Sequence, residues 1–167
     1  DRLRSPLMHL ARNATDHGIE APEVRLALGK ERIGTIALSA RNEGASVVIE
    51  VSDDGGGIDV ERISEAALES RLVSSSQLER MSREQRMKLI LAPGFSSKTE
   101  VTHLSGRGVG MDVVQTTIEQ LNGTLSISSE SMVGTTFTIH VPPILAVQRG
   151  IMLRCAGANF IIPTIAV

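Results

Sequence analysis

The sequence predicts an α/β protein: a two-layer sandwich in which one mixed, mostly antiparallel sheet carries helices on one face. Strand-like segments come in neighbouring pairs, at 33–41 with 47–53 and at 124–130 with 135–141. Such pairs form antiparallel hairpins, whereas a doubly wound parallel sheet needs single strands that alternate with helices. Amphipathic helical segments lie between the pairs, and their apolar sides need a sheet face to pack against.

Caps and turns set the boundaries of these elements. Helices are expected at about 2–17, 22–29, 60–72, 83–92 and 111–121, with a serine-rich break at 74–76. Gly18 and Asn122-Gly123 suit helix C-caps, and Pro22 suits a first helical turn. Pro142-Pro143 predicts a boundary between a domain at 1–143 and the incomplete start of a second at 144–167, with strand-like runs at 150–155 and 159–162. Since the chain begins at Asp1 rather than Met, we expect a piece of a longer protein.

The composition is that of an ordinary globular protein. Of the 167 residues 41% are hydrophobic and 22% charged, and the net charge is -2. That charge argues against a nucleic-acid partner, which normally requires a basic surface. One cysteine, Cys155, cannot form an internal disulfide, so a cytoplasmic location is expected. No apolar run approaches the roughly 18 residues of a membrane span.

A polar stripe runs along the first predicted helix. His9, Asn13, Asp16, His17 and Glu20 are spaced by three or four residues, so on a helix they share one face. An amide, two imidazoles and two carboxylates in line could hold a metal ion and a polyanion. Taken alone, such a stripe is more often a solvated helix face.

Two glycine-rich segments add to this pattern. The run Asp53-Asp-Gly-Gly-Gly-Ile-Asp59 follows a buried-type strand, where a carboxylate could accept a hydrogen bond from an exocyclic amino group; the alternative is a tight turn with solvated acids. The run Gly106-Arg-Gly-Val-Gly110 enters a helix, whose N-terminal amides favour phosphate. Its spacing fits neither the dinucleotide fingerprint nor a P-loop. Between the two, the loop 95–99 carries a lysine and hydroxyls and is either a lid over a terminal phosphate or a plain surface loop.

In chain order these motifs resemble the ATP-binding domain shared by histidine kinases, gyrase-type topoisomerases, mismatch-repair ATPases and Hsp90. That resemblance implies a Bergerat-type ATP-binding fold. The runs His9-x-x-Arg-Asn-x-x-Asp-His-Gly-Ile-Glu20, Pro93-Gly-Phe-Ser-Ser-Lys-Thr99 and Ser105-Gly-Arg-Gly-Val-Gly-Met-Asp-Val-Val114 are most similar to those of the CheA type of chemotaxis histidine kinase. The similarity covers about 1–143, and 144–167 resembles the first strands of a CheW-like regulatory domain.

The resemblance implies ATP and Mg²⁺ as cofactors and a role for each matching residue. Asn13 is the implied metal ligand, and His9 and Lys98 are the implied catalytic residues. His9 stands where gyrase- and Hsp90-type ATPases usually place a glutamate general base. Asp54 would bind the adenine amino group. The other implied nucleotide contacts are Asp16, His17, Gly56, Gly57, Ser96, Gly106, Gly108, Val109 and Gly110.

The implied activity is transfer of the ATP γ-phosphate to a histidine on a separate phosphotransfer domain, which then passes it to a response regulator. The resemblance also implies a homodimer through a domain absent here, and recruitment to membrane receptor arrays through a CheW-like adaptor and chemoreceptor. Two alternatives stay open: an ATP-driven clamp that hydrolyses ATP with water, and a non-catalytic nucleotide sensor.

Overall fold

The computed structural model describes residues 2–44, 46–95, 110–143, 150–155 and 158–163. The helices are α1 (Arg4–Asn13), α2 (Pro22–Ala27), α3 (Val60–Glu69), α4 (Ser75–Glu79), α5 (Arg83–Met87) and α6 (Met111–Gln120), with a π-helical turn at Ala14–Gly18 and a 3₁₀ turn at Lys88–Leu91. The strands are β1 (Ile36–Glu43), β2 (Ser46–Asp53), β3 (Thr124–Glu130), β4 (Gly134–Val141), β5 (Gly150–Cys155) and β6 (Ala158–Pro163).

Four strands form one sheet in the order β1-β2-β4-β3, and every described strand pair is antiparallel. Both predicted hairpins are present, and β2 pairs with β4 to join them. Strands β5 and β6 pair with each other in a separate two-stranded sheet. The division at 143 and 144 into two domains stays a prediction.

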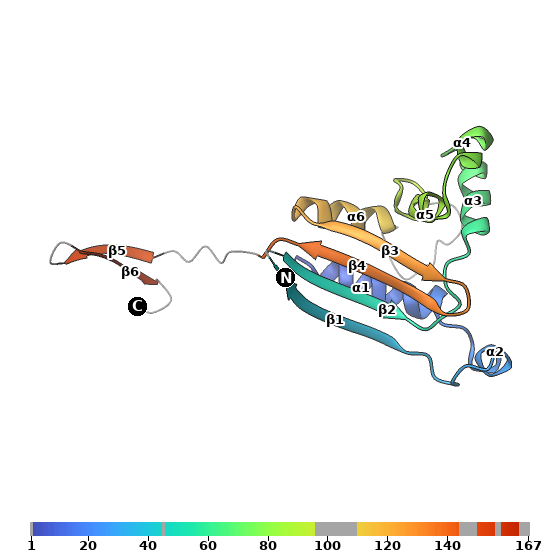
Figure 1. Ribbon diagram of the computed structural model, residues 1–167, viewed down its shortest axis with the longest axis horizontal. Helices are drawn as coiled ribbons and strands as arrows, with labels where there is room; N and C mark the ends of the chain where they lie inside the picture. Colours follow the sequence, from blue (N-terminus) through green and yellow to red (C-terminus); the bar gives the residue numbers. More distant parts are fainter. Residues whose placement is uncertain (1, 45, 96–109, 144–149, 156–157, 164–167) are drawn as a thin grey trace.

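The core lies between one face of the sheet and two helices. Alternation along β2 and β4 sends Ile49 and Val51 to the same face as Ile139 and Phe137, their partners in the register. Helices α1 and α6 pack on this face, α1 through Leu10 and α6 through residues that include Val114 and Ile118. Figure 1 shows α1 behind the sheet and α6 running along it near β3. The predicted α/β sandwich, with helices on one face of the sheet, is confirmed.

A second, smaller cluster packs beside the first and consists of Ile63, Ala67 and Leu89, from α3 and the 3₁₀ turn. Here the sequence prediction was less accurate. The expected helix at 60–72 ends at Glu69, and the expected break at 74–76 instead begins α4. Ser74 accepts a hydrogen bond from the backbone of Gln77 while the Gln77 side chain accepts one from Ser74, which is a capping box.

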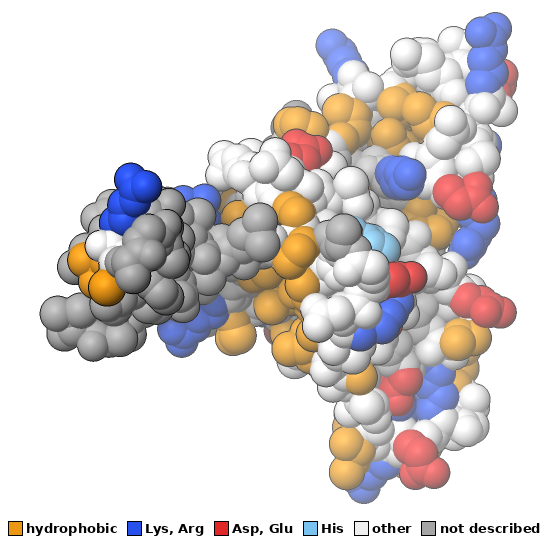
Figure 2. Space-filling view, turned by 60° about the vertical axis from the view of Figure 1, so that its left-hand side comes forward, with side chains coloured by type: hydrophobic (Ala, Val, Ile, Leu, Met, Phe, Trp, Pro, Cys, Tyr) orange, Lys and Arg blue, Asp and Glu red, His pale blue; other side chains and the backbone are white. Residues whose placement is uncertain are grey.

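The surface mixes both signs of charge. Figure 2 shows Lys and Arg side chains interspersed with Asp and Glu on the visible face. Within the described ranges, the helices are too short or too polar to cross a membrane.

Candidate functional site

The C-terminal end of α1 meets the N-terminus of α6. The side-chain amide of Asn13 donates to the Met111 sulfur over 3.0 Å, and Met111 is the first residue of α6. A thioether is a weak acceptor, so this contact does not commit the amide strongly. Gly110 is the N-cap residue of α6 and is extended, and no side chain caps it. The first turn of this ten-residue helix therefore lies next to Asn13, and its Val113 N–H donates to Asp112 Oδ1 at 2.9 Å. The N-terminus of a helix favours an anion.

His9 lies one turn before Asn13 on α1 and is half-buried. Burial lowers the pKa of its imidazole, and the charge of Arg12 lowers it further, while Asp112 on the first turn of α6 opposes them. The imidazole is therefore neutral at pH 7, and it can donate or accept a hydrogen bond without adding positive charge.

The predicted polar stripe holds only in part. Asp16 and His17 are exposed on the π-helical turn that continues α1. Glu20, which was expected on the same face, lies beyond the end of this turn, where Ile19 is already extended. Its carboxylate pairs with Arg25 and Lys30 instead. Glu20 therefore does not share the face of the other four residues: it lies beyond Gly18, where the sequence also predicts the end of the helix.

Asp53 closes β2 with a half-buried carboxylate. Burial raises its pKa, and the backbone N–H groups of Gly55 and Thr135 partly offset that rise. The Gly55 N–H donates to Asp53 Oδ1 over 3.0 Å. A carboxylate in this setting is stabilised by any further donor that reaches it, such as an amino group of a ligand.

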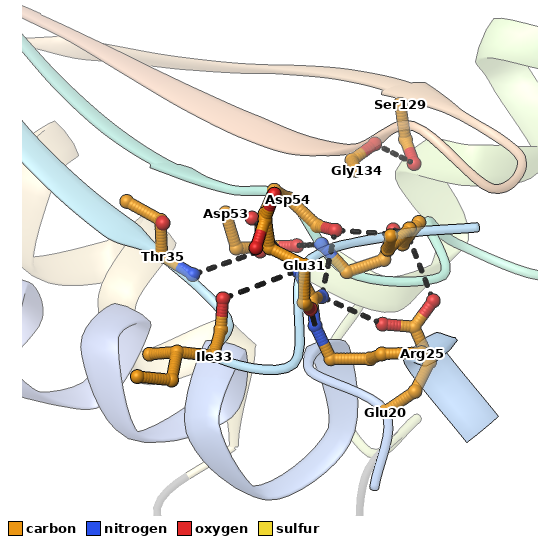
Figure 3. Close-up of polar contacts among 11 residues, drawn as sticks. Glu20, Arg25, Glu31, Ile33, Thr35, Asp53, Asp54, Ser129 and Gly134 are labelled. Atoms are coloured by element: carbon orange, nitrogen blue, oxygen red, sulfur yellow. Dashed lines mark hydrogen bonds and ion pairs between the residues drawn. The ribbon is translucent and has the colours of Figure 1, made fainter. Parts of the chain in front are cut away.

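Asp54, the predicted adenine ligand, has a different setting. Its Oδ2 pairs with Arg25 Nη2 at 2.9 Å, and its Oδ1 accepts from the Thr35 backbone N–H at 2.9 Å. Figure 3 shows both contacts on the side of the turn that faces α2 and the segment before β1. Both oxygens of Asp54 are thus engaged in holding the chain.

The three glycines after these acids differ in how much room they have. A Cβ on Gly55 would lie 2.0 Å from the Gly18 carbonyl oxygen, and one on Gly57 would lie 2.4 Å from that of Glu130. Gly57 also has a φ of +78°. A Cβ on Gly56 would meet nothing closer than 3.7 Å. The backbone geometry therefore requires glycine at 55 and 57 but not at 56, and the predicted nucleotide contacts of Gly56 and Gly57 stay predictions.

The spacing of the acids and glycines in this turn can be matched to Asp53 as well as to Asp54. In the frame Asp-x-Gly-x-Gly, the acid is Asp53 and the glycines are Gly55 and Gly57. The frame matches the half-buried acid and the two positions without space for a side chain.

Sequence reasoning missed a group of charged residues beside this turn: Glu20, Arg25 and Lys30, which join Asp54 (Figure 3). Arg25 is 1% exposed, and its guanidinium contacts both carboxylates. No spacing in the sequence distinguishes these residues from solvated charges.

Ser96, Lys98, Gly106, Gly108 and Val109 lie outside the described residues, so their predicted roles stay predictions. Across the described part of the chain, no three His, Cys, Asp or Glu side chains are grouped to hold a metal ion.

Comparison with known proteins gives the class of this chain. The family model of histidine kinase-, DNA gyrase B-, and HSP90-like ATPases matches residues 2–144. The chain belongs to this family, as its motifs predicted, and membership implies ATP as a ligand.

Individual proteins similar to this chain indicate which members of the family it resembles most. The chain is 47% identical over 165 residues to "Chemotaxis protein CheA" of Treponema pallidum, covering 99% of this chain and 20% of that protein. It is 45% identical over 167 residues to the protein of the same name from Salmonella typhimurium, covering 100% of this chain and 24% of that protein. It is 43% identical over 152 residues to "Gliding motility regulatory protein" of Myxococcus xanthus, covering 91% of this chain and 20% of that protein. The chain thus spans between a fifth and a quarter of the length of these relatives.

Proposed function

We propose that this chain is the ATP-binding catalytic domain of a chemotaxis-type histidine kinase, which transfers the γ-phosphate of ATP to a histidine on a separate phosphotransfer domain. The observation that carries the proposal is identity of 47% and 45% along 99% and 100% of this chain to proteins named for chemotaxis. Family membership supports ATP binding, and these relatives support transfer to histidine as its purpose.

Phosphoryl transfer depends on positioning and on neutralising the charge of the phosphates. We assign the phosphates to the N-terminus of α6, which lies next to Asn13 and whose helix dipole favours an anion. We assign Mg²⁺ to the amide oxygen of Asn13, because this ion prefers oxygen ligands and takes few from protein when phosphates supply the rest. When bound, Mg²⁺ neutralises phosphate charge.

We propose Asp53, rather than Asp54, as the acceptor for the adenine amino group. The support is that the Asp53 carboxylate is half-buried and its donors are two backbone N–H groups, whereas the Asp54 carboxylate is already ion-paired with the buried Arg25. Lys98 and Ser96 stay proposed contacts of the γ-phosphate. Gly106, Gly108, Val109 and Gly110 stay proposed contacts of the phosphates, and Asp16 and His17 of the same wall.

Transfer is favoured over hydrolysis by His9. A clamp that hydrolyses ATP is expected to carry a carboxylate base at this place on the first helix, and this chain carries His9 there instead. We propose that His9 contacts the triphosphate and helps orient it.

The test is incubation of the chain with γ-labelled ATP, Mg²⁺ and a phosphotransfer domain from a chemotaxis kinase, supplied separately. The proposal expects label on the histidine of that domain and none when this histidine is replaced by glutamine. Rapid release of free phosphate at the same rate with or without the domain would support the clamp instead. Stable ATP binding with neither product would support the nucleotide sensor.

The same relatives support proposals about the longer protein. We propose that a response regulator receives the phosphate, and that residues 144–167 begin a regulatory domain for a CheW-like adaptor and a chemoreceptor. A homodimer through a separate domain and a cytoplasmic position beneath receptor arrays complete this proposal.

A further inference from the structure

The charged residues beside the Asp53 turn have no assigned role in the proposed chemistry. We call Glu20, Arg25, Lys30 and Asp54 the Arg25 network. Arg25 comes from α2 and Asp54 from the turn after β2, as Figure 3 shows. Glu20 and Lys30 come from the segments on either side of α2. The network therefore links α2 and its flanking segments to the turn that carries the proposed adenine acceptor.

Arg25 uses its guanidinium on the backbone as much as on carboxylates. Its Nε donates to the Glu31 carbonyl at 2.8 Å, and its Nη1 donates to the Asp54 carbonyl at 3.1 Å and to Glu20 Oε2 at 3.0 Å. Its Nη2 donates to Asp54 Oδ2 at 2.9 Å. A planar fork of donors fixes several acceptors in one geometry, so Arg25 sets where the Asp54 peptide lies relative to α2.

Lys30 completes the hold on the turn. Its Nζ lies 2.8 Å from the Asp54 carbonyl oxygen, 2.7 Å from that of Gly55 and 2.8 Å from Glu20 Oε1. An ammonium group has three hydrogens, and here two of its three partners are consecutive carbonyls of the turn. The Glu20 carboxylate forms ion pairs with both Arg25 and Lys30 and so holds the two side chains in position.

The turn needs such an external hold because three successive glycines give it little stiffness of its own. Its backbone also contacts Gly18, whose carbonyl accepts from the Gly56 N–H at 2.9 Å, and Thr35, whose carbonyl accepts from the Asp54 N–H at 3.2 Å. These bonds use the N–H groups of the turn, whereas Arg25 and Lys30 take its carbonyls. Together they hold both the N–H and the carbonyl groups of the turn that follows Asp53, and Gly55 of this turn donates to the Asp53 carboxylate.

A purely stabilising role would explain ion pairs but not this choice of partners. A buried ion pair is weak evidence for stability, since desolvation offsets much of the attraction. In this network five of the hydrogen bonds from the two cations end on backbone carbonyls, those of residues 31, 33, 54 and 55, and two of the five end on the Asp54 oxygen. Hydrogen bonds to backbone carbonyls restrain the backbone conformation of the turn after β2.

We propose that Arg25 and Lys30 are positioning residues of the nucleotide site: they fix the Asp53 turn and so preset the acceptor for the base. This inference rests on the proposed function, in which the turn contacts adenine. It predicts that the network controls affinity for the base portion of the nucleotide and not for the phosphate portion.

The test compares Lys30→Met with wild type for binding of ADP and of inorganic tripolyphosphate, both with Mg²⁺. Lys30 is the better choice because its side chain is 15% exposed, against 1% for Arg25. The proposal expects ADP affinity to fall at least about tenfold, in line with the cost of small misplacements in a site, while tripolyphosphate affinity stays within about twofold. Lys30→Arg should recover most of the ADP affinity. The matched control is Arg41→Gln, which breaks an exposed ion pair with Glu50 on β1 and β2.

Equal ADP affinity in Lys30→Met and wild type would overturn the positioning role while leaving the proposed function intact. An equal loss for ADP and tripolyphosphate would also overturn it, because that result indicates general damage to the fold. If Lys30→Met does not fold, Lys30→Gln replaces it in the same comparison. Wild-type protein that binds tripolyphosphate but no adenine nucleotide would instead contradict the proposed function.

Discussion

Asp53 and Asp54 are neighbours in the chain but differ in what their carboxylates contact. Asn at 53 should weaken adenine-nucleotide binding at least about tenfold without lowering the free energy of unfolding, because it removes a half-buried charge whose pKa is raised by burial. Asn at 54 should lower that free energy by about 2 kcal/mol, since buried Arg25 loses a charged partner. Calorimetric binding of ADP and urea unfolding of Asp53→Asn and Asp54→Asn check both expectations. Loss of binding in a stable Asp54→Asn variant, with normal binding in Asp53→Asn, would return the acceptor role to Asp54.

Asn13 has one described side-chain hydrogen bond, to the Met111 sulfur at 3.0 Å. Asn13→Ala should therefore change the free energy of unfolding by less than about 1 kcal/mol. If its oxygen is the protein ligand of Mg²⁺, the same variant should remove the increase in ADP affinity that Mg²⁺ produces in wild type. Titration of ADP with Mg²⁺ and with EDTA, in both proteins, measures that increase directly. An unchanged increase in Asn13→Ala would remove the metal assignment.

Alanine substitutions in the turn after β2 show which of its glycines the fold requires. Gly55→Ala should destabilise the protein by about 1–3 kcal/mol, because its Cβ would overlap the Gly18 carbonyl oxygen at 2.0 Å. Gly56→Ala should change stability by less than about 0.5 kcal/mol, because the nearest atom lies 3.7 Å away. Urea unfolding of the two variants provides a matched comparison one residue apart. Equal destabilisation by both would mean that the turn lies differently from the geometry described.

The strands and long helices were predictable because their signal is repeated along the element. Val47, Ile49 and Val51 alternate on β2, and Val114 and Ile118 recur at helical spacing on α6, so several residues support each assignment. Short elements lack that repetition. Helix α4 has five residues, and its evidence was the capping box begun by Ser74, in a run that also suits a loop.

The candidate site was predictable where a motif records a backbone requirement, as in the spacing of Gly55 and Gly57. It was not predictable where the function of a residue depends on contacts distant in sequence. Arg25 reaches Asp54 across 29 positions, and nothing local marks its side chain as buried. Glu20 differs from this case, because its partners Arg25 and Lys30 are only 5 and 10 positions away, yet no local pattern distinguishes these ion pairs from solvated charges.

The two sides of the candidate site, the α1–α6 junction and the end of β2, pack on the same hydrophobic cluster. The α1–α6 wall and the strand that carries Asp53 share one hydrophobic cluster, which includes Leu10, Val51 and Ile118. Because side chains in such a cluster are close-packed, a shift of one wall is resisted by the other. The distance between the N-terminus of α6, the proposed phosphate site, and Asp53, the proposed adenine acceptor, is therefore a property of the whole domain.

Titratable groups on both walls make the stability of the molecule depend on pH. Burial lowers the pKa of His9, as does Arg12, so folding disfavours its protonated form, and stability decreases as the pH falls below about 6.5. Burial alone would raise the pKa of Glu20 and Asp54. Hydrogen bonds from Lys30 and Arg25 to Glu20, and from Thr35 and Arg25 to Asp54, outweigh it and hold both values low. Their contribution is complete above the ordinary carboxylate range and is lost as the pH falls through the lowered values.

The Asp53 carboxylate has the opposite effect on the pH dependence of stability. Its pKa is raised by burial, so the cost of its charge disappears on acidification and partly offsets the loss from Glu20 and Asp54. We expect the urea midpoint of wild type to decline slightly below about pH 6.5 and more steeply below about pH 4. His9→Asn should remove the first decline and leave the second, and Glu20→Gln should reduce the second while lowering stability at neutral pH. A midpoint for Glu20→Gln that stays parallel to wild type from pH 7 down to pH 3 would show that Glu20 is not held ionised by Lys30 and Arg25.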